Sequence, residues 1–371
     1  MHGRVISTEV FDSLIPILRD RGHIVVGPTL REDTITYDII DSAADLPIGW
    51  TDNHGPATYS VQSRDDGAYF GYVVGPRNLK RYLFPPRQTL LTIRSANSGL
   101  EFLPEPLEET SYAFIGVRAC ELAGMEIQDR VFGGPPFADP GYVSRRQNSF
   151  TVAVNCSIAG ETCFCDSMGT GPRCDDGYDL VVTEFLDDGT HEFLVQAGSS
   201  AGEEVLAKLE GREASREDMM QVQAIVDETI AHMGRTMDSE AAHDILADNL
   251  EHPIWDEIAD RCLSCTNCTL VCPTCFCSTV EDVTDLEGSA HRERRWDACF
   301  NREFTYLHGR PVRYTTRSRY RQWMTHKLSW WFEQFGSSGC VGCGRCITWC
   351  PAGIDITEEV ARFQEETAVM A

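Results

Sequence analysis

The sequence has no long apolar run. No stretch of its 371 residues approaches the roughly 20 consecutive apolar residues that a membrane-spanning helix needs. Its first twenty residues, MHGRVISTEVFDSLIPILRD, also lack the long apolar core of a secretory signal and predict an amphipathic helix. We therefore expect a soluble chain in the cytoplasm, where thiols stay reduced and disulfides are rare.

The sequence also lacks the common phosphate-binding and catalytic motifs. It contains no G-x-G-x-x-G on a strand-to-helix turn and no G-x-x-x-x-G-K-[ST], which excludes the usual dinucleotide and nucleotide cradles. Its ten histidines form no H-x-x-x-H pair, and no Ser, His and Asp constellation stands out. If the chain belongs to an enzyme, we expect the catalytic residues to lie on a different polypeptide of the complex.

Positive charge is scarce as well. The chain has 32 Lys and Arg against 57 Asp and Glu, which gives a net charge of -25. Such a chain repels the phosphates of nucleic acids, so nucleic-acid binding is not expected. At this length the chain should contain two or three domains.

Cysteine, in contrast, is abundant, and eight of the 16 cysteines follow one spacing twice. The spacing C-x2-C-x2-C-x3-C-P is the bacterial ferredoxin signature, in which three thiolates hold one [4Fe-4S] cluster and the fourth binds the other cluster. The sequence therefore predicts two [4Fe-4S] clusters with crossed ligands. One cluster is expected on Cys262, Cys265, Cys268 and Cys350, and the other on Cys340, Cys343, Cys346 and Cys272.

Zinc and disulfides are the alternatives for these cysteines. Structural zinc favours paired C-x2-C half-sites with four ligands in all, whereas each run offers three cysteines at three-residue steps and a fourth before proline. Disulfides do not fit a reducing compartment. The doubled spacing therefore favours iron–sulfur clusters over both alternatives.

A basic segment lies between the two motifs. Residues 292–327 hold nine arginines and one lysine against three acidic residues, which gives a local charge of +7. This charge either offsets the negative charge of a bound cluster, or forms a solvated basic face or a docking patch for an acidic partner. The sequence does not decide between these interpretations.

The other eight cysteines follow no standard motif. Cys120 and Cys156 each follow a predicted strand, and Cys163 and Cys165 form a C-F-C pair, so these four predict a third [4Fe-4S] cluster, with buried apolar cysteines as the alternative. Cys174 is a substitute for any one of them. A second C-F-C pair, Cys275 and Cys277, joins Cys299 in a group that either shields the first cluster or binds metal, and shielding is the favoured interpretation.

The first two hundred residues alternate strand-like and helix-like patterns, which predicts an α/β domain. A helix is expected at residues 119–132, directly after a strand, and further helices at residues 215–234 and 239–250. We expect an α/β domain over residues 1–205 with the third cluster, a helical connector over 206–255, and an α-helical dicluster ferredoxin-like domain with an insertion over 256–371. Strands are expected at residues 23–27, 34–40, 68–75, 113–117, 150–154, 179–185 and 191–198.

Seven segments together resemble a known family. The chain is similar to the iron–sulfur beta subunits of cytoplasmic NAD(P)-linked [NiFe] hydrogenases of the sulfhydrogenase type, and nearly as similar to the ferredoxin-like iron–sulfur subunit of anaerobic sulfite reductase. Glu121 stands where relatives usually carry Asp, which keeps the carboxylate. The segments are KRYLFPPRQTLL from Lys80, FIGVRACEL from Phe114, NCSIAGETCFCDSMGTGP from Asn155, CLSCTNCTLVCPTCFC from Cys262, RERRWDAC from Arg292, RYRQWMTHK from Arg319 and CVGCGRCITWCP from Cys340.

The resemblance implies a non-catalytic electron-transfer subunit of an oxidoreductase complex. Its expected partners are a flavin subunit that handles NAD(P)H, and a catalytic [NiFe] large subunit with its iron–sulfur small subunit. The alternatives are the iron–sulfur subunit of an anaerobic sulfite reductase and a free-standing ferredoxin-like carrier.

Overall fold

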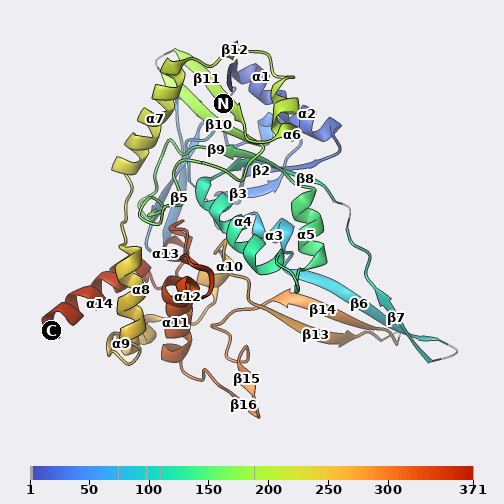
Figure 1. Cartoon of the computed structure of the whole chain (residues 1–371), viewed down its shortest axis with the longest axis vertical. Coiled ribbons are helices and arrows are strands. Elements are labelled where there is room, and N and C mark those ends of the chain that lie inside the picture. Colours follow the sequence, from blue (N-terminus) through green and yellow to red (C-terminus); the bar gives the residue numbers. More distant parts are fainter. Residues whose placement is uncertain are drawn as a thin grey trace.

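The N-terminal half is built on a mixed sheet with helices on both faces (Figure 1). A computed structural model of the chain describes residues 3–73, 75–96, 99–108, 110–187, 189–286 and 288–370. Four adjacent strands, β2, β8, β9 and β10, run parallel, and the outer pairs are antiparallel. The sheet order is β12 (Arg212–Glu213), β1 (Gly3–Ser7), β11 (Thr190–Ala197), β10 (Leu180–Asp187), β9 (Phe150–Val154), β8 (Tyr112–Val117), β2 (Ile24–Arg31) and β3 (Thr34–Ile39).

Alternate residues of the central strands face two different cores. Ala113 and Ile115 of β8 pack with helices α1 (Thr8–Asp12), α2 (Leu14–Asp20) and α6 (Ser200–Leu206). Phe114 and Val117 of the same strand pack with α3 (Lys80–Leu83), α4 (Ala119–Phe132) and α5 (Pro140–Gln147). Both faces are buried, as expected for parallel strands with continuous apolar runs.

The C-terminal part is mainly helical and has its own core. Trp255, Trp323, Met324 and Phe363 pack together there, along with several of the motif cysteines. The helices are α7 (Arg216–Ala231), α8 (Ser239–Asp248), α9 (Ile254–Arg261), α10 (Asn267–Leu270), α11 (Thr316–Thr325), a π-helical segment (His326–Trp330), α12 (Trp331–Phe335), α13 (Arg345–Thr348) and α14 (Ile356–Met370). The predicted fold class, an α/β domain with a helical dicluster domain, is confirmed.

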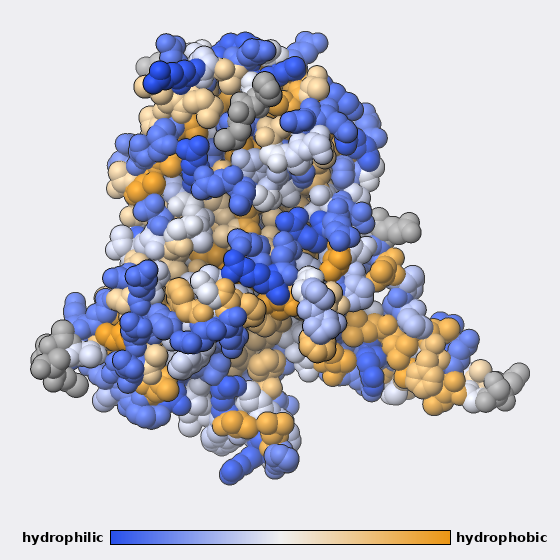
Figure 2. Space-filling model, in the orientation of Figure 1, coloured by the Kyte–Doolittle hydropathy of each residue, from blue (hydrophilic) through white to orange (hydrophobic). Residues whose placement is uncertain are grey.

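A four-stranded sheet joins the two halves and extends outward as an arm (Figure 1). Its order is β13 (Ser278–Thr284), β14 (Ala290–Trp296), β6 (Arg87–Ala96) and β7 (Gly99–Pro104). Leu100 and Phe102 on β7 are 67% and 59% exposed, and Figure 2 shows apolar side chains along this arm. Because the sheet takes strands from both expected domains, the domain bounds at 205 and 255 stay a prediction.

Smaller elements complete the chain. They are a one-turn helix η1 (Ala43–Asp45), a hairpin of β4 (Trp50–Gly55) and β5 (Thr58–Ser63), and a short hairpin of β15 (Tyr306–Leu307) and β16 (Arg310–Pro311). Within the described ranges, no helix combines the length and the apolar character needed to cross a bilayer.

Two secondary-structure predictions were wrong. The expected strand at residues 68–75 is irregular over its described residues, because the Tyr69 and Phe70 amides donate to the Glu184 carboxylate at 2.7 and 2.9 Å instead of to a neighbouring strand. The expected helix at the N-terminus begins as strand β1, which pairs with β11 before α1 starts at Thr8. The other six predicted strands are present, and α4 spans the predicted residues.

Candidate metal centres

The two ferredoxin motifs fold into matching loops. Ser264 and Thr266 in the first loop have φ of 52° and 72°, and Gly342 and Gly344 occupy the same places in the second loop with φ of 61° and 70°. This left-handed backbone turns amides toward the sulfurs, and the Ser264 amide donates to Cys262 Sγ at 3.4 Å. Amide donation of this kind stabilises cluster-bound thiolates.

The glycines of the second loop have a further reason. A Cβ on Gly342 would lie 2.5 Å from the carbonyl oxygen of Phe164, and the Phe164 amide donates to the Gly342 carbonyl at 2.9 Å. The second loop therefore packs against the loop that carries the first C-F-C pair, which brings two of the predicted cysteine groups together.

The cysteines of the first motif line a small cavity of about 30 Å³. Cys350, from the second motif, lies in the same wall, as the crossed arrangement requires. Phe300, Tyr320 and Trp323 close the cavity and keep it largely apolar. The cysteines in the wall are Cys262, Cys265, Cys268, Cys346 and Cys350.

Cys272 lies with the second motif. Burial raises the pKa of Cys340, Cys343 and Cys346, and the nearby Cys272 contributes to the rise in each case. The Lys327 ammonium donates to Cys272 Sγ at 3.2 Å, and a hydrogen bond from Cys275 together with this cation holds the pKa of Cys272 well below its usual range. Cys272 and Cys350 are thus exchanged between the motifs in position, and their ligand roles stay a prediction.

The four cysteines of the α/β domain converge as well. Cys120 begins α4 directly after β8, and Cys156 follows β9, the parallel neighbour of β8, so both lie at the carboxyl edge of the sheet. With Cys163 and Cys165 they line one cavity of about 20 Å³, and Cys343 of the second ferredoxin motif is in the same wall. Burial raises the pKa of Cys163 to about 12.

Cys174 lies elsewhere. Its amide donates to Asn155 Oδ1 at 2.8 Å and its thiol to the Val154 carbonyl at 3.5 Å, and it lines a different cavity. Cys275, Cys277 and Cys299 line a further cavity of about 30 Å³. Among the described residues, no three His, Cys, Asp or Glu side chains converge closely enough for a single metal ion.

Four buried cations lie beside these cysteines, although the chain as a whole is strongly acidic. Lys80 Nζ donates to the carbonyls of Cys272 and Cys275, both at 3.0 Å, and lies 4.1 Å from the centre of the Trp296 ring. Arg118 lines the cavity of the α/β domain. Buried charge of this kind is stable only when opposite charge is close, which is the setting of an anionic cluster.

Arg345 is the fourth of these cations and binds Glu121. Its Nε donates to the Gly75 carbonyl at 2.7 Å, and its Nη2 forms an ion pair with Glu121. Burial opposes the charged form of Arg345, but Glu121 and Cys343 outweigh it and raise its pKa. Sequence reasoning did not assign roles to Lys80, Arg118 and Arg345, although each lies in a segment that carries the family resemblance. The R-A-C and G-R-C sequences place two of them next to cysteines.

The basic segment serves more than one purpose. Lys327 lies at a cysteine sulfur, whereas Arg292 and Arg295 form exposed ion pairs with Asp282 and Glu281 on the arm. Both interpretations of the local charge therefore describe part of the segment.

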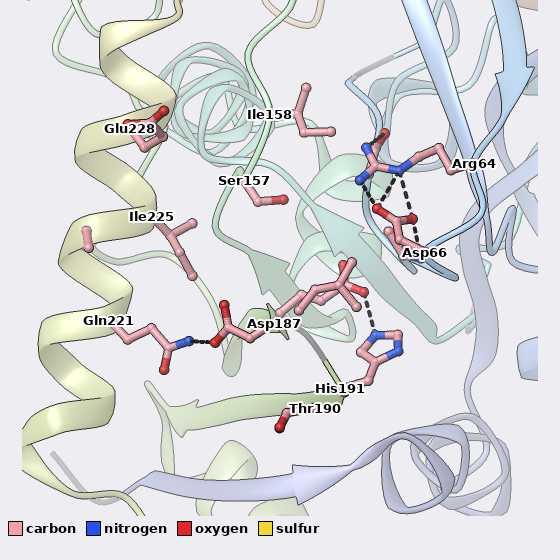
Figure 3. Close-up of a pocket in the computed structure, with 16 residues that line it drawn as sticks. Arg64, Asp66, Ser157, Ile158, Asp187, Thr190, His191, Gln221, Ile225 and Glu228 are labelled. Carbon is pink, nitrogen blue, oxygen red and sulfur yellow. Dashed lines mark hydrogen bonds and ion pairs between the residues drawn. The ribbon is translucent and has the colours of Figure 1, made fainter.

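The largest cavity lies between the edge of the main sheet and α7 and measures about 890 Å³ (Figure 3). Its charged side chains pair with each other: Arg64 with Asp66, and His191 with Glu184 at 2.8 Å. Ile158 lines both this cavity and the one that contains Cys120 and Cys156. The large cavity is therefore one side chain away from the cysteines of the α/β domain.

Comparison with known proteins agrees with these features. Residues 261–354 match the family described as a 4Fe-4S dicluster domain. The chain is 29% identical over 365 residues to sulfhydrogenase 2 subunit beta of Pyrococcus furiosus, covering 96% of this chain and 97% of the relative. The resemblance to sulfhydrogenase beta subunits is confirmed. No solved structure matches the chain.

The near-complete coverage of both chains extends the likeness beyond the dicluster segment. It includes the α/β domain with Cys120, Cys156 and the first C-F-C pair. The chain is thus a dicluster protein that resembles a hydrogenase beta subunit throughout its length.

Proposed function

We propose that this chain is the iron–sulfur electron-transfer subunit of a cytoplasmic [NiFe] hydrogenase complex. It relays electrons between a flavin subunit that handles NAD(P)H and the catalytic [NiFe] large subunit with its iron–sulfur small subunit. The observation that carries the proposal is that the cysteine groups share walls. Cys346 of the second motif lines the cavity of the first motif, and Cys343 lines the cavity of the α/β domain.

The residues fit the clusters that this role needs. Each group offers four thiolates, and the two ferredoxin loops add backbone amides, while Lys327 and Arg118 supply buried positive charge. A [4Fe-4S] cluster held there supplies reversible one-electron transfer. Cys265 is exposed, whereas Cys120 and Cys156 are buried, so the row of groups leads from the interior to the surface.

The exposed apolar arm supports a place in a larger assembly. Leu100, Phe102 and Val280 on its strands are more than half exposed. Clusters of exposed apolar residues are typical of surfaces that meet another protein.

Purification of the complex from the native host under anaerobic conditions tests the partners. We expect a flavin-containing subunit and a nickel-containing subunit to copurify with this chain. A sirohaem subunit in their place would assign the chain to an anaerobic sulfite reductase. Recovery of the chain alone would contradict the relay role and leave the free-standing carrier.

Single-cysteine variants test the crossed ligands. Because Cys272 lies with the second motif, Cys272→Ala should disturb the paramagnetic resonance signal of the cluster held by Cys340, Cys343 and Cys346. Cys268→Ala should disturb the other signal. If both variants damage the same cluster, the crossed arrangement is wrong.

A further inference from the structure

Three cysteines outside the two ferredoxin motifs and the α/β group share one cavity. Cys275 and Cys277 follow the first motif, and Cys299 lies more than twenty residues later, yet all three line the same wall. The two C-terminal cavities, this one and that of the first ferredoxin motif, are the same size, about 30 Å³ each.

The arm hairpin brings these cysteines together. β13 begins at Ser278 and β14 ends at Trp296, and these two residues are paired in the antiparallel ladder. The ladder continues one step further, because the Asp297 amide donates to the Cys277 carbonyl at 2.9 Å. The open end of the hairpin therefore holds Cys277 beside the turn that carries Cys299.

The opposite wall comes from the helical core. The π-helical segment that begins at His326 interrupts the helix between α11 and α12, and His326 and Lys327 from it line the cavity. Single π-helical turns within α-helices occur frequently at functional sites. Here the wider turn presents two polar side chains in succession to the same cavity.

His326 supplies the fourth donor. Its ring lies between aromatic groups, 6.1 Å from the Phe276 ring and 6.3 Å from the Trp331 ring, measured between centroids. In the part of the chain that the structure describes, this ring makes no hydrogen bond, so its nitrogens are not committed to a protein partner. Three thiols and one imidazole thus face one enclosed space.

Positive charge surrounds this set of donors. Lys80 Nζ donates to the carbonyl of Cys275, and Lys327 Nζ donates to Thr274 Oγ1 at 2.7 Å. Both lysines are buried. Two buried ammonium groups beside three thiols suit a metal–thiolate group that carries negative charge.

We propose that Cys275, Cys277, Cys299 and His326 bind a further [4Fe-4S] cluster, beyond the two of the dicluster domain and the one expected in the α/β domain. Three thiolates and one imidazole make a complete ligand set for such a cluster, in which histidine ligation raises the reduction potential, as it does in Rieske centres. The inference is independent of the identity of the partner subunits, because it concerns only residues of this chain.

Iron and acid-labile sulfide analysis of the anaerobically purified chain tests the site. Cys277→Ser should lower the iron content by about four atoms per chain relative to the natural sequence, the content of one [4Fe-4S] cluster. Cys174→Ser is the matched control, since Cys174 is buried but lies in a different cavity, and it should leave the iron content unchanged. The resonance signals of the two ferredoxin-type clusters should persist in both variants.

A second variant covers the case in which Cys277→Ser does not fold. His326→Cys should keep the iron and shift the resonance signal of one cluster, because the ligand set changes from mixed to all-thiolate. Unchanged iron in Cys277→Ser, or an unchanged spectrum in His326→Cys, would overturn the proposal. Loss of one zinc per chain in Cys277→Ser, without loss of iron, would also overturn it and identify a single-ion site.

Discussion

Replacing Arg345 with alanine is expected to lower the free energy of unfolding by about 3 to 5 kcal/mol, because the change leaves the Glu121 carboxylate buried without its cation. Both side chains are 1% exposed. The remaining Glu121 oxygen accepts from the Leu79 amide at 3.2 Å, which is too little to compensate a buried charge.

The effect should reach beyond the ion pair itself. Arg345 lies two residues from Cys343, and Glu121 follows Cys120, so the pair joins the second ferredoxin loop to the α/β domain at two cysteine groups. The guanidinium also donates to Gly75, which anchors a segment before α3. We therefore expect Arg345→Ala to weaken the contact between the two halves of the chain.

Thermal unfolding of the anaerobically purified protein, followed by circular dichroism, measures this effect. Arg292→Ala is the matched control, because it removes an arginine from an ion pair whose side chains are about half exposed. Such pairs contribute at most about 1 kcal/mol, so this variant should unfold near the temperature of the natural sequence. Equal unfolding temperatures for the two variants would contradict a stabilising role for the buried pair.

Much of the α/β domain could be predicted because its signals are local. The apolar run at residues 150–154 forms the fully buried strand β9, and Ser215 with Asp218 forms the predicted capping box at the start of α7. The cysteines that follow β8 and β9 were expected at one sheet edge because parallel neighbours end on the same side, and the structure places them there.

The arm could not be predicted, because its pairing is not local. β14 pairs with β6, about two hundred residues earlier in the chain, and its sequence AHRERRW was interpreted only as part of a basic segment. Its charged residues are held by cross-strand ion pairs, such as that of Arg87 with Glu293 at 2.5 Å.

The relation between the cysteine groups also depends on tertiary packing. The spacing of Cys340, Cys343 and Cys346 predicts a cluster loop, but not that Gly342 rests against Phe164 of the α/β domain. The predicted single helix at residues 319–336 likewise contains a π-helical turn, which brings His326 and Lys327 to one cavity. Such juxtapositions follow from how separate elements dock, which local spacing does not encode.

Electron flow through the assembled complex tests the relay most directly, and Cys346→Ser should abolish it. Cys346 belongs to the second ferredoxin motif and lines the cavity of the first, so it lies where the two groups meet. A serine hydroxyl is nearly the same size but a much poorer cluster ligand than a thiolate, so the fold should persist while the cluster is damaged or lost. Cys174→Ser, which changes a cysteine outside the cavities of the three predicted clusters, is the control.

The measurement is hydrogen evolution driven by NAD(P)H, recorded alongside the half-reaction of each partner subunit with an artificial dye. Our account predicts that Cys346→Ser reduces NAD(P)H-driven evolution to background while both dye reactions stay at the level of the natural complex, and that Cys174→Ser changes neither. Full hydrogen evolution from NAD(P)H in the Cys346→Ser complex would contradict the relay role of this chain.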